Sequence, residues 1–134
     1  MEPSVREHQP IHVLIVEDEF LISEWVARSL SEQGFDVRTV TNAADALRHL
    51  ASLPVDVLFT DINLPGGMDG AALAWRAREI RPDLPVVYAS ARATMLKQDA
   101  RVPGSMVVPK PYEPAFVGRL LAAATRAATA AVPA

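Results

Sequence analysis

The chain contains no cysteine, which excludes a disulfide framework and any metal site that needs thiolate ligands. It has no run of basic residues and its formal net charge is -3, so a nucleic-acid partner is not expected. No stretch approaches the roughly 20 apolar residues that a transmembrane helix requires. The polar stretch from Met1 to Pro10 lacks the apolar core of a secretion signal. We therefore expect a cytoplasmic location and no membrane partner.

The chain is nevertheless long and apolar enough to fold as one domain. Its 134 residues are 50% hydrophobic, which is sufficient for a packed core. We expect the domain to span residues 11–127, after a disordered tail over residues 1–10. A second tail is expected over residues 128–134, because the alanine-rich end of the last helix is predicted to fray after Arg126.

Short apolar segments alternate with segments of helical spacing along the chain. Strands are predicted over residues 11–16, 35–40, 55–60, 85–89 and 105–108. Helices are predicted over residues 20–33, 43–51 and 69–80, and from Pro114 onward. Asn42 and Gly34 stand where an N-cap and a C-cap belong. Between Ser90 and Ser105 the helical pattern is weak, with one or two turns expected from Met95 to Arg101, and we expect this segment to be the most mobile.

Two of the predicted helices show an apolar side that we expect to face the core. For the helix over residues 20–33 these residues are Leu21, Ile22, Trp25, Val26 and Leu30. For the last helix they are Phe116, Val117, Leu120 and Leu121.

Strands that alternate with helices at this spacing predict an α/β fold with a doubly wound, five-stranded parallel sheet and helices on both faces. Right-handed crossovers leave few topologies, and we expect the flavodoxin-like order 2-1-3-4-5. In such folds ligands bind beyond the carboxyl ends of the strands, where the strand order reverses. The residues that follow each strand are therefore the candidates for chemistry.

Polar side chains follow four of the predicted strands. The first strand ends in Glu17 and Asp18, the third in Asp61, the fourth in Ser90, and the fifth in the stretch that holds Lys110. The ends converge in a sheet of this order, which brings three carboxylates, one hydroxyl and one ammonium into a single pocket. At about 4 Å and an effective dielectric constant near 20, each pair of carboxylates repels by roughly 4 kcal/mol. Lys110 and a divalent cation would offset this repulsion, and oxygen ligands favour Mg²⁺ over zinc.

Asp61 is then a candidate nucleophile, because carboxylates form acyl phosphates and phosphoryl transfer needs mainly positioning and charge neutralisation. Each residue alone also fits a plainer role. The acids after the first strand could be a solvated turn near a helix N-terminus, Ser90 a turn residue, and Lys110 a surface lysine. The three histidines are not spaced like a metal site. The joint pattern favours the functional interpretation.

With these residues in place, the chain resembles the receiver domain of two-component response regulators, over about residues 11–126. The stretches that carry the resemblance are V-L-I-V-E-D-E (13–19), L-F-T-D-I-N-L-P (58–65), V-V-Y-A-S (86–90) and K-P-Y (110–112). The resemblance implies that Asp61 accepts a phosphoryl group, that Lys110 binds the phosphate, and that Ser90 is the switch hydroxyl. The Mg²⁺ ligands that it implies are an acid pair, the acceptor and a backbone carbonyl: Glu17, Asp18, Asp61 and Asn63.

The resemblance also implies a donor and a mode of action. A sensor histidine kinase or a histidine phosphotransfer protein would supply the phosphoryl group, and a downstream protein target would read the switched surface. The chain would be a monomer or a phosphorylation-dependent dimer, and not an enzyme beyond its own phosphorylation and dephosphorylation. The Lys110–Pro111 bond is expected to be cis, and Arg92 to slow phosphoryl loss beside Asn63.

Some features depart from the common receiver pattern. Val107 stands where most receivers carry an aromatic residue, so we expect backbone movement to carry the switch. Tyr88, Ala89 and Ser90 match the first positions of the F-A-T-G-Y motif of an alphaproteobacterial subgroup, whereas Ala91 and Arg92 do not match its last two.

Two alternatives fit the residues less well than this interpretation. An aspartyl phosphatase needs a second acid two residues after its nucleophile, and Asn63 cannot serve as one. A degenerate receiver that acts as a phosphorylation-independent docking module would usually lack an acid, the acceptor or the lysine, and all are present here. The chain is either a stand-alone receiver or an excised one.

Overall fold

The computed structural model describes residues 9–91 and 100–131. Along the chain the elements are β1 (His12–Val16), α2 (Phe20–Glu32), β2 (Asp36–Val40), α3 (Ala43–Ser52), β3 (Val57–Asp61), α4 (Gly70–Ile80), β4 (Val86–Ser90), β5 (Met106–Pro109) and α5 (Pro114–Ala131). The five strands pair in parallel in the order β2-β1-β3-β4-β5, which confirms the predicted fold. None of the helices in the described ranges is both long and apolar enough to cross a membrane.

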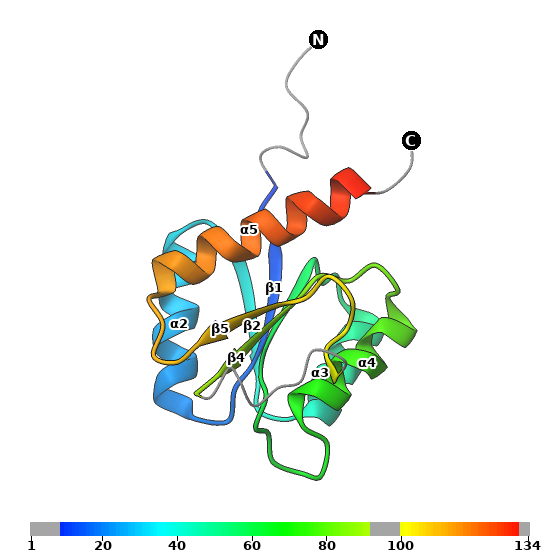
Figure 1. Cartoon of the computed structure of the whole chain (residues 1–134). Helices are drawn as coiled ribbons and strands as arrows, with labels where there is room; N and C mark the ends of the chain where they lie inside the picture. The colour runs from blue at the N-terminus through cyan, green and yellow to red at the C-terminus, as the bar shows by residue number, and fades with distance from the viewer. Residues whose placement is uncertain (1–8, 92–99, 132–134) are drawn as a thin grey trace.

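The helices form two layers, with α2 and α5 on one face of the sheet and α3 and α4 on the other (Figure 1). Successive side chains of a strand point to opposite faces. In β3, for example, Leu58 packs against α3 and α4, whereas Phe59 packs against α2 and α5. Every residue of β3 and β4 is buried, including the polar residues at their carboxyl ends, Asp61 and Ser90. The carboxyl ends of β3 and β4, where the sequence predicts chemistry, are therefore buried.

The predicted caps are present. The Asp45 backbone N–H donates to the Asn42 side chain over 2.8 Å, which satisfies a free donor at the start of α3. Gly34 follows α2 at φ 103°, a conformation that glycine adopts readily. Asp69 caps α4 in the same way through the Ala72 N–H, at 2.8 Å.

The predicted inward faces of two helices are partly wrong. In α2 the buried residues are Ser23, Val26 and Leu30, whereas Leu21 and Trp25 are exposed. The spacing of three and then four residues from Ser23 defines the stripe that meets the sheet, and Leu21 and Trp25 lie on the neighbouring row. In α5 Val117 and Leu121 are buried, whereas Phe116 is exposed by 44%.

The C-terminal helix is longer than the sequence predicted. It continues to Ala131 instead of fraying after Arg126. Its last residues are almost all alanine, which has the highest helix propensity and loses no side-chain entropy in a helix. The predicted boundary at residue 127 therefore falls inside α5.

The segment between β4 and β5 is described in part. Arg92, and most of the turn predicted from Met95 to Arg101, lie outside the described residues. The part before β5 is held by side chains of α4 and β4. Trp75 Nε1 donates to the Ala100 carbonyl over 2.9 Å, and the buried Tyr88 hydroxyl accepts from the Val102 N–H over 3.1 Å. Burial of the hydroxyl raises the pKa of Tyr88, although the Val102 hydrogen bond opposes the rise.

Candidate functional site

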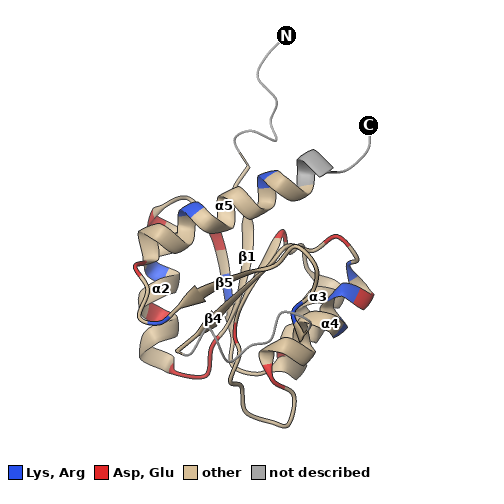
Figure 2. Cartoon of the chain, in the orientation of Figure 1, with Lys and Arg blue, Asp and Glu red and all other residues tan. Residues whose placement is uncertain are grey.

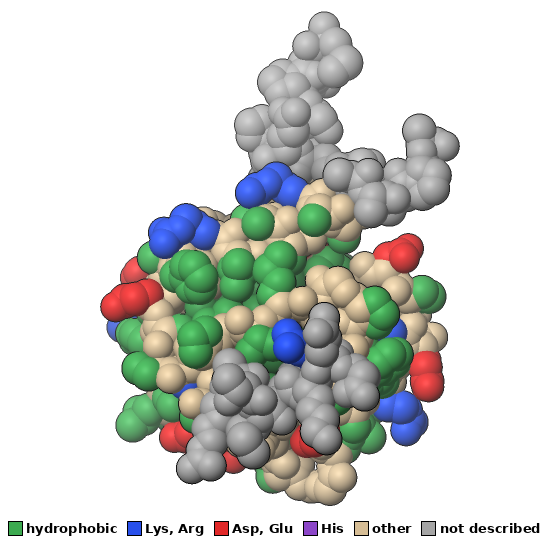
Figure 3. Space-filling model, viewed as in Figure 1, with side chains coloured by type: hydrophobic (Ala, Val, Ile, Leu, Met, Phe, Trp, Pro, Cys, Tyr) green, Lys and Arg blue, Asp and Glu red, His purple; other side chains and the backbone are tan. Residues whose placement is uncertain are grey.

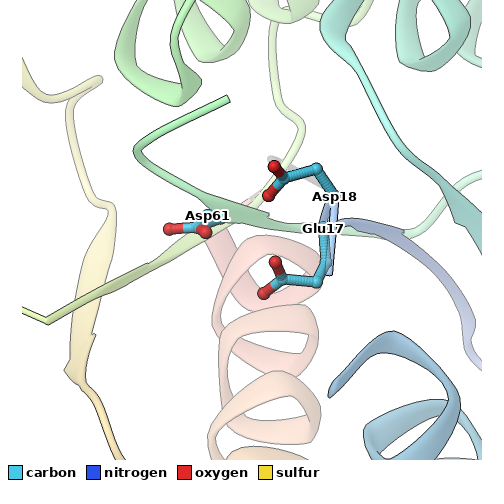
Figure 4. Close-up of side chains that lie close together, drawn as sticks. All are labelled: Glu17, Asp18 and Asp61. Atoms are coloured by element: carbon cyan, nitrogen blue, oxygen red, sulfur yellow. The ribbon is translucent and has the colours of Figure 1, made fainter. Parts of the chain in front are cut away.

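Three carboxylates meet at the carboxyl ends of the central strands. Glu17 and Asp18 follow β1 directly, and Asp61 ends the neighbouring β3, where Thr60 is paired with Val16. One oxygen of each carboxylate lies within 4.8 Å of the others. Figure 4 shows the three groups pointing into a common space, and Figure 2 shows the acidic residues on the loop that joins β1 to α2. The structure thus brings together the three acids that the sequence predicted.

Lys110 reaches the same space from the chain that follows β5. Its Nζ lies 2.9 Å from Asp61 Oδ2 and 3.5 Å from Glu17 Oε1. Its backbone N–H donates to the Ser90 carbonyl over 2.8 Å, which ties the lysine to the end of β4. The Lys110–Pro111 bond is cis, as predicted.

The charges of the site are unbalanced. Burial raises the pKa of Glu17, and this effect outweighs the hydrogen bond from the Glu19 N–H and the charge of Lys110. Burial alone would lower the pKa of Lys110, but the hydrogen bond and charge of Asp61 outweigh it, so the pKa is raised. Among the described residues the pocket holds three acids and one cation, Lys110, and a further cation would be stabilised there.

The donor set fits a hard divalent cation. All the carboxylate oxygens are suitable ligands for Mg²⁺, and the described part of the site holds no histidine that would favour zinc. Glu17 is 4% and Asp61 8% exposed, whereas Asp18 is exposed to solvent. Asp18 therefore forms the open side of the site, where a partly hydrated ion can enter.

The remaining predicted residues lie at the edge of this group. Ser90 is the last residue of β4, is 5% exposed, and is paired with Pro109 of β5. Asn63 is exposed in the loop between Asp61 and α4, two positions beyond the acceptor candidate. Their sequence positions agree with the predicted roles, and those roles remain predictions.

Two residues near the site were not assigned a role from the sequence. Tyr112 stacks on Trp25 at a centroid distance of 6.3 Å and meets Phe59 edge-on at 5.6 Å. Burial, followed by the charges of Glu17 and Asp61, raises the pKa of Tyr112. The other residue is Gly70, whose backbone packs against the backbone of Asp61. The sequence Asp69-Gly70 at the start of a predicted helix does not indicate that Gly70 contacts Asp61.

The sequence model of the family described as response regulator receiver domain matches residues 13–121 of this chain. The chain belongs to this family. The response regulator receiver protein CpdR of Brucella abortus (strain 2308) is 34% identical over 102 residues, which cover 75% of this chain and 84% of that protein. The DNA-binding transcriptional regulator NtrC of Escherichia coli (strain K12) is 35% identical over 106 residues, but the chain spans 22% of its length.

A solved structure supports the same assignment. The response regulator receiver protein from Sinorhizobium medicae WSM419 superposes with a TM-score of 0.83 at 29% identity, and covers 89% of this chain and 97% of its own. The receiver fold and the two-component family are therefore established, as the sequence predicted.

Proposed function

We propose that this receiver domain accepts a phosphoryl group on Asp61 from a sensor histidine kinase or a histidine phosphotransfer protein. The observation that carries the proposal is the position of the Asp61 carboxylate, which is buried among two other acids and lies 2.9 Å from Lys110 Nζ. We place this reaction in the cytoplasm. The proposal does not include an aspartyl-phosphatase activity, since the residue two positions after Asp61 is Asn63, which cannot protonate a leaving group.

In the proposed reaction an Asp61 oxygen attacks the phosphorus of a phosphohistidine. An O–P bond forms as the N–P bond breaks, and the leaving imidazole takes up a proton from solvent. Lys110 binds one phosphoryl oxygen and the Ser90 hydroxyl donates to another. Glu17, Asp18, Asp61 and the Asn63 carbonyl would hold Mg²⁺, which when bound neutralises charge that develops on the phosphoryl oxygens.

An apolar strip beside the acids supports docking of a protein donor. Phe20 is 71%, Leu21 79% and Trp25 52% exposed, and all three lie in the first turns of α2. A contiguous patch of exposed apolar side chains on a soluble domain is a feature of protein interaction sites. We propose that the strip packs against a helix of the donor while the phosphohistidine reaches Asp61.

A different face is proposed to transmit the phosphorylated state. Hydrophobic side chains gather on the face that α5 and β5 form (Figure 3). Phosphorylation adds up to about two negative charges at Asp61, and Ser90, at the end of β4, is paired with Pro109 of β5. Movement of Ser90 toward the phosphoryl group would therefore shift β5 and alter this face, which would bind a downstream protein or a second copy.

The test compares phosphorylation of two aspartate variants. Wild type is incubated with acetyl phosphate and Mg²⁺, and the covalent phosphoryl group is measured by intact mass and on Phos-tag gels. Asp61→Asn should accept none. Asp69→Asn is the matched control, because asparagine caps α4 as well as aspartate does, and it should be modified like wild type. Equal modification of Asp61→Asn and wild type would show that Asp61 is not the acceptor. If neither acetyl phosphate nor any kinase modified wild type, the alternative of a phosphorylation-independent docking module would be favoured.

A further inference from the structure

Gly70 opens α4 directly above the acceptor. Its N–H donates to the Ile62 carbonyl over 2.7 Å. A Cβ on this residue would overlap the carbonyl oxygen of Asp61 and would lie 2.9 Å from Ile62 Cα. Both neighbours are backbone atoms, so neither can move aside by changing a side-chain rotamer. The φ angle of Gly70 is not positive, so its backbone conformation does not require glycine. Glycine is required because there is no room for a side chain.

The backbone of Asp61 and Ile62, which Gly70 contacts, determines the position of the Asp61 side chain. The Ile62 N–H donates to the Ala89 carbonyl over 3.1 Å, so the peptide after Asp61 is held by β4 on one side and by α4 on the other. The Gly70–Ile62 bond also closes the loop over residues 62–70, which includes Asn63. One glycine thus sets the distance between α4 and two groups of the candidate site, the Asp61 carboxylate and the loop that carries the Asn63 carbonyl.

We propose that Gly70 is a positioning residue for the metal and phosphoacceptor site. This inference rests on the proposed function of Asp61. A methyl group at position 70 forces α4 and the Asp61 peptide apart, which moves the carboxylate away from Lys110 Nζ and from the oxygens of Glu17 and Asp18. Metal binding and phosphoryl transfer both require these groups in fixed positions, and misplacement by about 1 Å reduces a rate by about 100-fold.

The chain offers a matched control in Gly118 of α5. It also lies in a helix without positive φ, and a Cβ there would overlap the Gln33 side chain. The overlapping atoms belong to the flexible end of that side chain, which can turn away. Gly118→Ala therefore introduces the same methyl group into a helix without touching the backbone of a site residue.

The experiment compares Gly70→Ala, Gly118→Ala and wild type as whole chains. Far-UV circular dichroism and thermal melts establish folding, with trimethylamine N-oxide added where a variant is marginal. Isothermal titration with MgCl₂ alone gives the metal affinity, and acetyl phosphate gives the maximal rate and half-saturating concentration. We expect folded Gly70→Ala to bind Mg²⁺ at least about tenfold more weakly and its maximal rate to fall by about 100-fold. Gly118→Ala should stay within about twofold of wild type in both measurements.

The outcomes separate this inference from the proposed function. Loss of Mg²⁺ affinity in Gly70→Ala supports the positioning role even if wild type accepts no phosphoryl group, in which case the proposed function fails alone. Folded Gly70→Ala with wild-type metal affinity and rate overturns the inference. An equal loss in Gly118→Ala also overturns it, because the effect is then not specific to the site. A Gly70→Ala chain that stays unfolded in the osmolyte overturns it as well, since the glycine then serves the fold.

Discussion

Lys110 Nζ donates to Asp61 Oδ2 across 2.9 Å and so links the chain after β5 to the end of β3. The two side chains are 19% and 8% exposed, so water screens their attraction only in part. Among the described residues this ammonium is the positively charged group that contacts Asp61. The contact therefore connects two parts of the chain and neutralises part of the negative charge at the site.

Removal of this ammonium should destabilise the metal-free protein. Lys110→Met leaves the Asp61 and Glu17 carboxylates facing each other, and we expect the free energy of unfolding to fall by about 2 kcal/mol. Arg76→Met is the control, because it breaks a 3.5 Å pair with Glu79 in which both side chains are more than half exposed. Its effect should stay below about 0.5 kcal/mol. Urea unfolding in EDTA measures both, and equal effects would contradict the assigned role of Lys110.

Glu17 should make stability depend on pH. Its pKa is raised in the folded state above the ordinary value of 4.5, so the folded chain holds the proton more tightly than the unfolded chain does. Within the window between the two pKa values, the contribution of Glu17 to stability therefore falls as pH rises. Glu17→Gln should remove that slope and make the metal-free protein more stable at pH 7. Urea unfolding of both proteins from pH 4 upward tests this, and an unchanged slope in the variant would show that another group is responsible.

Asp18 should contribute more to Mg²⁺ affinity than Glu17. Both Glu17 oxygens already accept hydrogen bonds, one from Lys110 Nζ at 3.5 Å and the other from the Glu19 N–H at 3.0 Å. Asp18 is exposed, and its carboxylate has no such bond within the described ranges. We expect Asp18→Asn to weaken Mg²⁺ binding by at least about tenfold, or about 1.4 kcal/mol, and Glu17→Gln by less. Isothermal titration gives both constants, and the reverse order would mean that Glu17 is the more direct ligand.

The Tyr88 hydroxyl should stabilise the connection into β5. Tyr88→Phe leaves the buried Val102 N–H without its 3.1 Å acceptor, at a cost of about 1–2 kcal/mol. Tyr112→Phe is the control, since the Tyr112 hydroxyl makes no hydrogen bond within residues 9–91 and 100–131, and its ring contacts are kept. Urea unfolding and hydrogen exchange at Val102 measure the difference. Similar losses in both variants would point to ring packing instead of the hydroxyl.

The sequence predicted the sheet order and the group of acids because these depend on local, repeated signals. Strands that are buried on both faces can be recognised in the sequence as short apolar runs. The residue after each run then lies at the carboxyl end of its strand, where ligands bind in such folds. The exposure of Leu21, Trp25 and Phe116 was not predicted, because helical spacing gives an apolar side but not how much of that side the sheet covers. The contact of Gly70 with Asp61 joins two elements across a loop, and no local pattern encodes such a close approach.

The stacked pair of Trp25 and Tyr112 gives the protein a built-in optical probe. Trp25 is 52% exposed, so its indole is in contact with water, while its partner ring lies close enough to Glu17 and Asp61 for their charges to act on it. A change of charge at the acids alters the electric field across the stacked rings, and the emission spectrum of the indole responds to that field. With Trp75 replaced by phenylalanine, Trp25 would be the single tryptophan of the chain. Occupancy of the site could then be followed in real time without a label.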